Sequence, residues 1–210
     1  MRRSLCLLLL MATACARVTA AVPASAPPLR DGVPIRALKY YRLLRGAVNH
    51  AWGVRQSADV FGAQIKTESD FDPEVCSKDK LGHPIACGMG QFTVATAQGI
   101  AQLYKAELWP PKVLSADWSI TALVYHDYDN WLLFPAAVGD NRYGLMLAAY
   151  NMGETWLRRE RMATLRRGED HEQWFDGVEN SCVRRPSACQ ETKGYVSTII
   201  KQYRPMFRGW

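Results

Sequence analysis

Residues 65–73 read Ile65-Lys66-Thr67-Glu68-Ser69-Asp70-Phe71-Asp72-Pro73. Just before and within this stretch, Ala58, Phe61 and Ile65 recur at steps of three and four residues, which is one face of a helix. Glu68 continues that face, so the spacing predicts a carboxylate pointing at the core. A carboxyl group among apolar side chains is harder to ionise, so it can keep a proton near neutral pH and give it to a leaving group. The alternative is a helix-end glutamate that extends to solvent or accepts a hydrogen bond.

Three further segments follow Glu68 in the chain. They are Gly88-Met89-Gly90-Gln91-Phe92, Leu147-Ala148-Ala149-Tyr150-Asn151-Met152-Gly153 and Glu191-Thr192-Lys193-Gly194-Tyr195-Val196. With Glu68-Ser69, they resemble the four motifs of the lytic transglycosylase (SLT) family: Glu-Ser-x-Phe-x-Pro, Gly-Leu-Met-Gln, Ala-Tyr-Asn-x-Gly and Glu-Thr-x-x-Tyr-Val. The motifs stand in the family's order from about Ala63 to Tyr203. The resemblance implies a lysozyme-like fold that cleaves the glycan strands of peptidoglycan.

The resemblance also implies a reaction in which Glu68 acts alone as general acid and base. Ordinary glycosidases use two carboxylates. Members of this family are understood to protonate the β-1,4 oxygen between N-acetylmuramic acid and N-acetylglucosamine, and then to take a proton from the muramoyl C6 hydroxyl. Because that hydroxyl replaces water, the product carries a 1,6-anhydromuramoyl end. The neighbouring N-acetyl group can help to stabilise the positive charge at the anomeric carbon.

Substrate-binding residues follow from the same resemblance. Tyr150 and Asn151 would present a hydroxyl and an amide to the N-acetyl groups, although Tyr150 lies among Leu and Ala and can equally be core with a solvated tip. The glycines of the second motif would let a sugar approach closely or would only end a hairpin. Glu191 and Tyr195 are one helical turn apart and would face the same cleft, unless Glu191 is an ordinary first-turn helix charge. The full predicted set is Ser77, Met89, Gln91, Tyr150, Asn151, Glu191 and Tyr195.

Some residues depart from the family pattern. Gly90 stands where the family has Met, and the segment 77–88 is longer than the family's Ser-x-x-Gly-Ala-x-Gly spacing. The lip of the cleft is therefore expected to differ. The segment 115–134 also lacks the Asn and Gly of the family's Asn-x-x-x-Gly-x-x-Tyr-Leu stretch. Its contribution to substrate binding is left open by the sequence.

The first residues predict export. Arg2 and Arg3 precede an apolar run over 5–11 that is too short to span a membrane and suits a signal peptide. Val18-Thr19-Ala20 has the small-residue spacing for cleavage after Ala20. Cleavage before Cys15, with lipid anchoring, is less favoured because Ala12-Thr13-Ala14-Cys15 lacks the usual leucine. We therefore expect a periplasmic protein.

Six cysteines fall into two groups. Cys6 and Cys15 belong to the leader, and the other four have short spacings. In an oxidising compartment these four predict disulfides, most simply 76 with 87 and 182 with 189. A zinc site of four thiolates is the alternative, but the C-x-x-C pairs that such sites prefer are absent from the sequence. The histidines at 50, 83, 126 and 171 are isolated, so no metal or cofactor is predicted. The four cysteines are Cys76, Cys87, Cys182 and Cys189.

Length and charge predict one domain and no nucleic-acid partner. The segment 21–34, rich in Ala, Pro and Ser, predicts an exposed tether, and 35–210 suits a single domain. The net charge of +6 falls to +3 without the leader, because Arg2, Arg3 and Arg17 leave 23 basic and 20 acidic residues. Arginines nevertheless gather in the last third. They would form a solvated helix face, or would contact acidic wall polymers, anionic membrane or an envelope-spanning secretion, conjugation or pilus complex. They are Arg158, Arg159, Arg161, Arg166, Arg167, Arg184 and Arg185.

Hydrophobic periodicity predicts a mainly α, lysozyme-like domain with at most a small β-hairpin lining the cleft. A turn at Gly82-His83-Pro84 would close the hairpin within 75–92. Asp140 or Asn141 would cap the fifth helix, and Gly153 would end it. The helices are expected over 36–52, 58–69, 93–107, 115–134, 142–152, 154–165 and 191–203.

Two other functions remain open from the sequence. A goose-type lysozyme would share the fold and Glu68 but admit water, and a second carboxylate would favour it, for which Asp70, Asp72 and Glu191 are candidates. A weakly catalytic wall-binding component of an envelope complex is the other.

Overall fold

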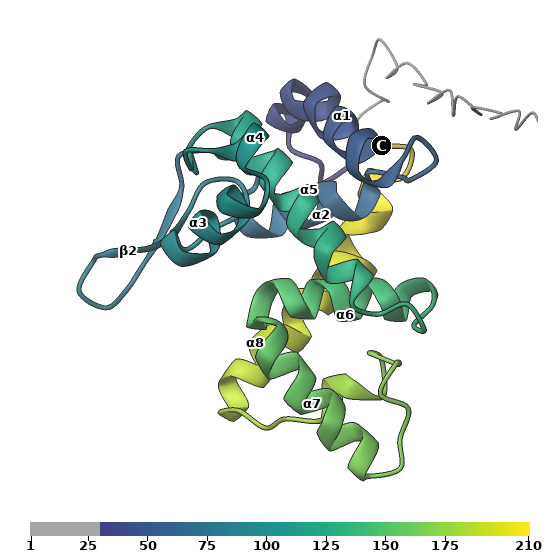
Figure 1. The fold of residues 1–210 in the computed structure, drawn as a ribbon. Helices are drawn as coiled ribbons and strands as arrows, with labels where there is room; N and C mark the ends of the chain where they lie inside the picture. The colour runs from purple at the N-terminus through teal and green to yellow at the C-terminus, as the bar shows by residue number, and fades with distance from the viewer. Residues whose placement is uncertain (1–29) are drawn as a thin grey trace, which may run out of the picture.

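The computed structural model describes residues 30–210, which are mainly helical with one small antiparallel hairpin (Figure 1). The predicted mainly α fold is confirmed. The predicted leader, both cleavage sites and the tether as far as residue 29 lie outside the described residues. The α-helices are α1 (Tyr41–Trp52), α2 (Asp59–Ser69), α3 (Val94–Leu103), α4 (Lys105–Leu108), α5 (Ala116–Leu132), α6 (Gly139–Met152), α7 (Glu154–Arg166) and α8 (Pro186–Ser197). The strands are β1 (Cys76–Lys78) and β2 (Pro84–Cys87), and the short helices are η1 (Ile35–Tyr40), η2 (Val178–Asn180), η3 (Thr198–Tyr203, a π-helix) and η4 (Arg204–Phe207).

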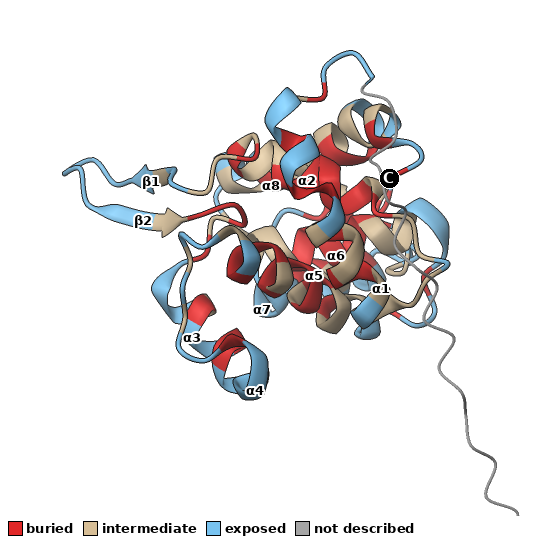
Figure 2. Ribbon diagram, turned by 90° about the horizontal axis from the view of Figure 1, so that it is seen from above, coloured by how far each residue is buried: buried red, intermediate tan, exposed pale blue. Residues whose placement is uncertain are grey.

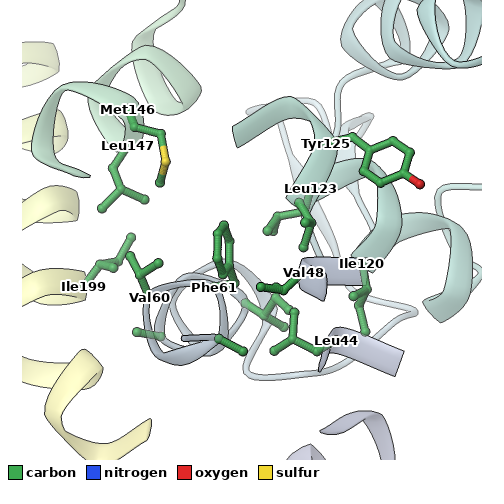
Figure 3. Packing of buried hydrophobic residues seen from close by; sticks show 14 of the residues in the cluster. Leu44, Val48, Val60, Phe61, Ile120, Leu123, Tyr125, Met146, Leu147 and Ile199 are labelled. Carbon is green, nitrogen blue, oxygen red and sulfur yellow. The ribbon is translucent and has the colours of Figure 1, made fainter. Parts of the chain in front are cut away.

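The core lies around α5, which packs against α1 and α6, and it extends to α2, which packs against η3 and η4 (Figure 2). Phe61 of α2 is fully buried between Leu123 of α5 and Leu147 of α6 (Figure 3). Ile199 of η3 packs on the other side of α2. This apolar packing fixes the direction of α2, and therefore the position of Glu68 in its last turn.

The end of α2 is held by residues that follow it. Asp70 and Phe71 both have left-handed backbones, with φ of 51° and 63°, so the chain leaves the helix abruptly. Phe71 is fully buried against the rings of Phe207 and Trp210. The Asp70 carboxylate accepts from Lys66 Nζ at 3.0 Å and pairs with Arg36. The turn after Glu68 is therefore tied both to the core and to the surface.

Several predicted boundaries are wrong, because distant contacts override local signals. The helix expected over 93–107 breaks at Tyr104, whose hydroxyl donates to Asp129 of α5 at 2.7 Å. Neither Asp140 nor Asn141 caps α6, which begins at Gly139. Asp140 accepts instead from Arg204, and Asn141 accepts from the backbone N–H of Phe175.

The first and last predicted helices also differ from the structure. The segment 35–40 is a 3-10 helix leading into α1, rather than the start of one long helix. The last helix begins at Pro186, five residues earlier than expected, with proline in its first turn where its missing N–H costs nothing. It continues as the π-helix η3 from Thr198. Gly153 ends α6 as predicted.

The packed domain begins slightly earlier than residue 35. Val33 is buried, so the prediction of an exposed tether over 21–34 is wrong at this residue. In the part of the chain that the structure describes, no helix has the length and apolar character needed to cross a membrane.

Candidate active site

A hollow of about 490 Å³ opens beside Glu68. Its walls come from the end of α2, the turn after β2, α3, α5, and the junction of α6 with α7. It therefore lies where most of the predicted motifs meet. Its lining residues are Glu68, Gln91, Phe92, Thr93, Thr96, His126, Asn130, Ala149, Tyr150, Asn151, Met152, Gly153 and Glu154.

Glu68 stands at the edge of the core and is partly exposed to the hollow. The predicted helix face is correct for Ala58, Phe61 and Ile65, which are fully buried, but the carboxylate faces the hollow rather than the core. Desolvation raises the pKa of Glu68 to about 7. The Tyr195 hydroxyl donates to Glu68 Oε1 at 2.5 Å, and this bond partly counters the rise because it stabilises the carboxylate. Glu68 can therefore hold or release a proton near neutral pH.

Ser69, next to Glu68, ties α2 to the turn after β2. Its hydroxyl donates to the carbonyl of Met89 at 3.1 Å. Met89 was predicted to bind substrate, but its side chain is fully buried in the core. That prediction is wrong, because the second motif turns inward at this residue and only its backbone meets Ser69.

The glycines on either side of Met89 are required by close packing. At Gly88, whose φ is 79°, an added Cβ would lie 1.8 Å from the carbonyl oxygen of Val113. At Gly90, an added Cβ would lie 2.8 Å from the Tyr150 hydroxyl, which donates to the Gly90 carbonyl at 2.7 Å. The glycine that replaces the family's methionine is therefore matched to the position of Tyr150.

Gln91 lines the hollow, while Ser77 does not. The Gln91 amide nitrogen donates to the carbonyls of Val75 and Gly88 at 3.0 Å each, and its oxygen accepts from the backbone N–H of Ser77. The Ser77 hydroxyl donates to the carbonyl of Ala86 within the hairpin. The structure thus gives Gln91 a place at the base of the hairpin and leaves Ser77 outside the hollow.

Tyr150, Asn151 and Tyr195 are brought together around Glu68. Burial, with the nearby Glu68, raises the pKa of Tyr150 and Tyr195 well above the usual value, so both hydroxyls remain neutral donors. Asn151 Oδ1 accepts from the hydroxyl of Thr192 at 2.6 Å. Within the described residues, its amide nitrogen has no hydrogen-bond partner in the structure and is free for a ligand.

Glu191 does not share the hollow with Glu68. It is exposed and lines a neighbouring hollow of about 400 Å³ on the α8 side. Asn151 and Met152 line both hollows, so the two adjoin along the end of α6. The prediction that Glu191 and Tyr195 face the same hollow is therefore wrong, because α8 turns Tyr195 towards Glu68 and Glu191 away from it.

Helix α5 supplies two lining residues that the motifs did not indicate. His126 packs its ring against Tyr150, 5.2 Å between centroids, and desolvation lowers its pKa to about 4, so the imidazole is neutral. Asn130 is buried, and its amide nitrogen has no hydrogen-bond partner in the described part of the chain. Helix α5 thus forms one wall of the hollow, and its contribution to substrate binding stays a prediction. Its only signal in the sequence is a pair of polar residues one helical turn apart.

A second buried acid, Asp127, also escaped the sequence analysis. It is fully buried on α5, and Gln64 Nε2 donates to its Oδ1 at 3.4 Å. Desolvation raises its pKa well above the usual range, with Glu68 adding to the rise. Among the residues that the structure describes, neither Asp127 Oδ2 nor Gln64 Oε1 has a hydrogen-bond partner.

The second carboxylates considered from the sequence do not reach the Glu68 hollow. Asp70 is engaged by Arg36 and Lys66, and Asp72 accepts from the backbone N–H of Glu74. The carboxylate that does line the hollow beside Glu68 is Glu154, at the start of α7, which is exposed.

The four cysteines form the two expected disulfides, Cys76–Cys87 and Cys182–Cys189. The first bridge closes the base of the hairpin, with the two residues opposite each other in the antiparallel register. The second closes the loop that leads into α8. Among residues 30–210, no cluster of His, Cys, Asp and Glu is arranged to hold a metal ion.

Comparison with known proteins gives one family match. The family model described as "Transglycosylase SLT domain" matches residues 50–173, more than half of the chain. The match contains Glu68, the hairpin, α5 and α6, and it ends before the loop of the second disulfide. No curated protein matches the chain.

Proposed function

Because this chain belongs to the SLT transglycosylase family, which acts on peptidoglycan, we propose that it is a lytic transglycosylase with Glu68 as general acid and base. The bond cleaved is the β-1,4 bond between N-acetylmuramic acid and N-acetylglucosamine. The observation that carries the proposal is the position of Glu68, a carboxyl group with a pKa of about 7 on the wall of an open hollow. A general acid is most effective when its pKa lies near the working pH.

In the first step, protonated Glu68 gives its proton to the glycosidic oxygen as the bond from that oxygen to the anomeric carbon breaks. The Tyr195 hydroxyl holds Oε1, so Oε2 is the oxygen that serves the substrate. The hydrogen bond fixes the carboxyl plane before the reaction, which avoids reorganisation during it.

In the second step, the Glu68 carboxylate accepts the proton of the muramoyl C6 hydroxyl as that oxygen bonds to the anomeric carbon. The product is a 1,6-anhydro ring, and Glu68 is again protonated. Asn151 and Asn130 offer amide N–H groups in the same hollow. They suit the carbonyl of the substrate's N-acetyl group, which would stabilise the charge at the anomeric carbon.

A hydrolase that admits water is the second candidate, and one observation favours it. Glu154 shares the hollow with Glu68 and has no ion pair within the described residues. A second carboxylate could activate a water molecule on the opposite face of the sugar. Glu154 is exposed, however, and so lacks the desolvation that tunes Glu68.

The site of action belongs to the same proposal. The leader over residues 1–20 would deliver the enzyme to the periplasm, where its substrate lies and where disulfides persist. Both bridges of the domain suit that compartment.

Digestion of purified sacculi tests the reaction. We expect muropeptides that are lighter by one water than those with reducing ends, measured by mass spectrometry. Glu68→Gln keeps the size of the side chain but removes its proton, so the yield should fall by about 100-fold or more. Glu154→Gln is the matched control and should still yield anhydro ends. Products with reducing ends alone, lost in Glu154→Gln, would instead establish the hydrolase.

A further inference from the structure

The arginines of the last third of the chain are not equivalent. Three of the seven form ion pairs with acidic residues: Arg161 with Glu172, Arg167 with Glu169 and Arg184 with Glu160. Arg185 is exposed, and its guanidinium has no hydrogen bond or ion pair within the described residues. It lines the hollow of about 400 Å³ that adjoins the Glu68 hollow through Asn151 and Met152.

The same hollow contains an acidic group without a partner. Glu191 lines it from α8, is exposed, and makes no hydrogen bond or ion pair among residues 30–210. As far as residues 30–210 show, the hollow therefore offers one free cation and one free anion, and Trp156 supplies an aromatic wall. The other arginine in it, Arg184, is already held by Glu160 and by the hydroxyl of Thr192.

We propose that this second hollow binds the stem peptide of the peptidoglycan strand, at a group that carries an ammonium and a carboxylate on the same carbon. The inference rests on the proposed function, because a glycan strand in the Glu68 hollow would place its stems nearby. Such a group is the free end of a diamino acid that has not been cross-linked.

The charges of the hollow match that group. A guanidinium binds a carboxylate through two parallel hydrogen bonds, which a neutral or purely cationic group cannot accept. Glu191 would accept from the ammonium, and the Trp156 ring would cover the aliphatic part of the side chain. An acidic polymer without ammonium groups would be repelled by the negative charge of Glu191 and would therefore bind this hollow more weakly.

The loop that carries Arg185 is well supported. The Cys182–Cys189 bridge closes it, and the Arg184–Glu160 pair anchors it at 3.0 Å, with both side chains largely buried. Ligand groups held in place before binding lose less entropy on binding. Arg185 lies beyond residue 173, where the family match ends.

The test compares three kinds of uncross-linked glycan strand. One kind carries stems with free diaminopimelate, the second has the side-chain carboxylate of that residue amidated, and the third has been stripped of stems by an amidase. For the parent protein we expect KM to be lower by about 10-fold for the first kind than for the other two, which corresponds to one charge-assisted interaction. Arg185→Gln and Glu191→Gln should each bring the ratio of these KM values close to one.

Arg166→Gln is the matched control. It removes the same charge from an exposed arginine of α7 that does not line this hollow, and it should keep the ratio of the parent. A ratio near one in the parent would overturn the proposal. The proposal would also be overturned if Arg185→Gln lost the preference for free diaminopimelate while Glu191→Gln kept it, since that would show a site for any anion.

Binding is measured separately with the Glu68→Gln protein, by retention of the same labelled strands. This measurement does not depend on cleavage. If the parent cleaves no strand but Glu68→Gln still prefers free diaminopimelate, the proposed function fails and the stem site stands. If cleavage occurs without that preference, only the stem site is refuted.

Discussion

At the scale of single residues, the proposed chemistry depends on one carboxyl group and the hydroxyl that donates to it. Burial raises the pKa of Glu68 to about 7, and the Tyr195 hydroxyl limits the rise by donating to Oε1. Tyr150 is in the same hollow, but its hydroxyl donates to the Gly90 carbonyl. Two tyrosines close to one acid therefore have different electrostatic effects on it.

This difference predicts a pH dependence. Glu68 must be protonated to act as an acid, so the activity of the parent should fall as the pH rises through about 7. Tyr195→Phe removes a bond that stabilises the carboxylate, so the pKa of Glu68 should rise and the alkaline limb of the activity profile should move to higher pH. Rates of sacculus cleavage by the parent and the variant between pH 5 and 9 would measure this shift of the alkaline limb.

Tyr150→Phe is the matched control for that profile. It removes a hydroxyl from the same hollow without removing a hydrogen bond to Glu68, so its alkaline limb should coincide with that of the parent. An alkaline limb that moves downward in Tyr195→Phe, or that moves equally in both variants, would contradict the role given to Tyr195.

At the scale of elements, α2 and α5 meet through a polar contact inside the core. Gln64 lies one turn before Glu68 on α2, and Asp127 faces it from α5, both fully buried. Each side chain has one oxygen without a hydrogen-bond partner within residues 30–210. A proton on Asp127 Oδ2 would let it donate to Gln64 Oε1, which closes an acid–amide pair and satisfies both oxygens.

Asp127→Asn tests this pair through stability. In the parent, folding raises the pKa of Asp127, so its contribution to stability is full below about pH 4 and is lost as the pH rises towards the folded-state pKa. Asparagine keeps the shape and both hydrogen bonds but does not titrate. The variant should therefore gain stability over the parent by up to about 1.4 kcal/mol for each pH unit between pH 5 and 7.

Urea unfolding in a Glu68→Gln background measures this gain, because that background removes the titration of Glu68 itself. Asp117→Asn, an exposed aspartate in the first turn of α5, controls for a change of net charge. A difference between Asp127→Asn and the parent that stays constant with pH would show that Asp127 is not protonated on folding.

At the scale of the whole molecule, residues far apart in the chain hold α2, the helix that carries Glu68. The Trp210 carbonyl accepts from the backbone N–H of Ala58 at 2.9 Å, just before α2 begins. Its ring packs against those of Tyr41, Phe71 and Phe207, and Phe71 directly follows the end of α2. Both ends of the helix that carries Glu68 thus rest on one aromatic cluster.

Trp210→Ala should therefore destabilise the fold by about 3–5 kcal/mol, the usual cost of removing a large aromatic side chain from a core. Urea unfolding of the parent and the variant measures it. Trp109→Ala is the control, because Trp109 is 52% exposed and its loss should change stability much less. Equal losses of unfolding free energy in the two variants would show that the aromatic cluster around Trp210 has no special role in stability.

The sequence by itself determined the helical class, the apolar helix face of Ala58, Phe61 and Ile65, and the two disulfides, whereas the Glu68 carboxylate faces the hollow and not the core. These features depend on local spacing, and periodicity reports directly which residues share a face. Only the tertiary structure decided that α5 also lies beside Glu68. His126, Asp127 and Asn130 come close to it because α5 packs against α6 and contacts α2 through Asp127 and Gln64, and no local pattern encodes these contacts. Contacts with distant parts of the chain also explain the wrong predictions. Met89 is buried in the core, and Asp140 pairs with Arg204 instead of capping its helix. Glu191 lines a second hollow.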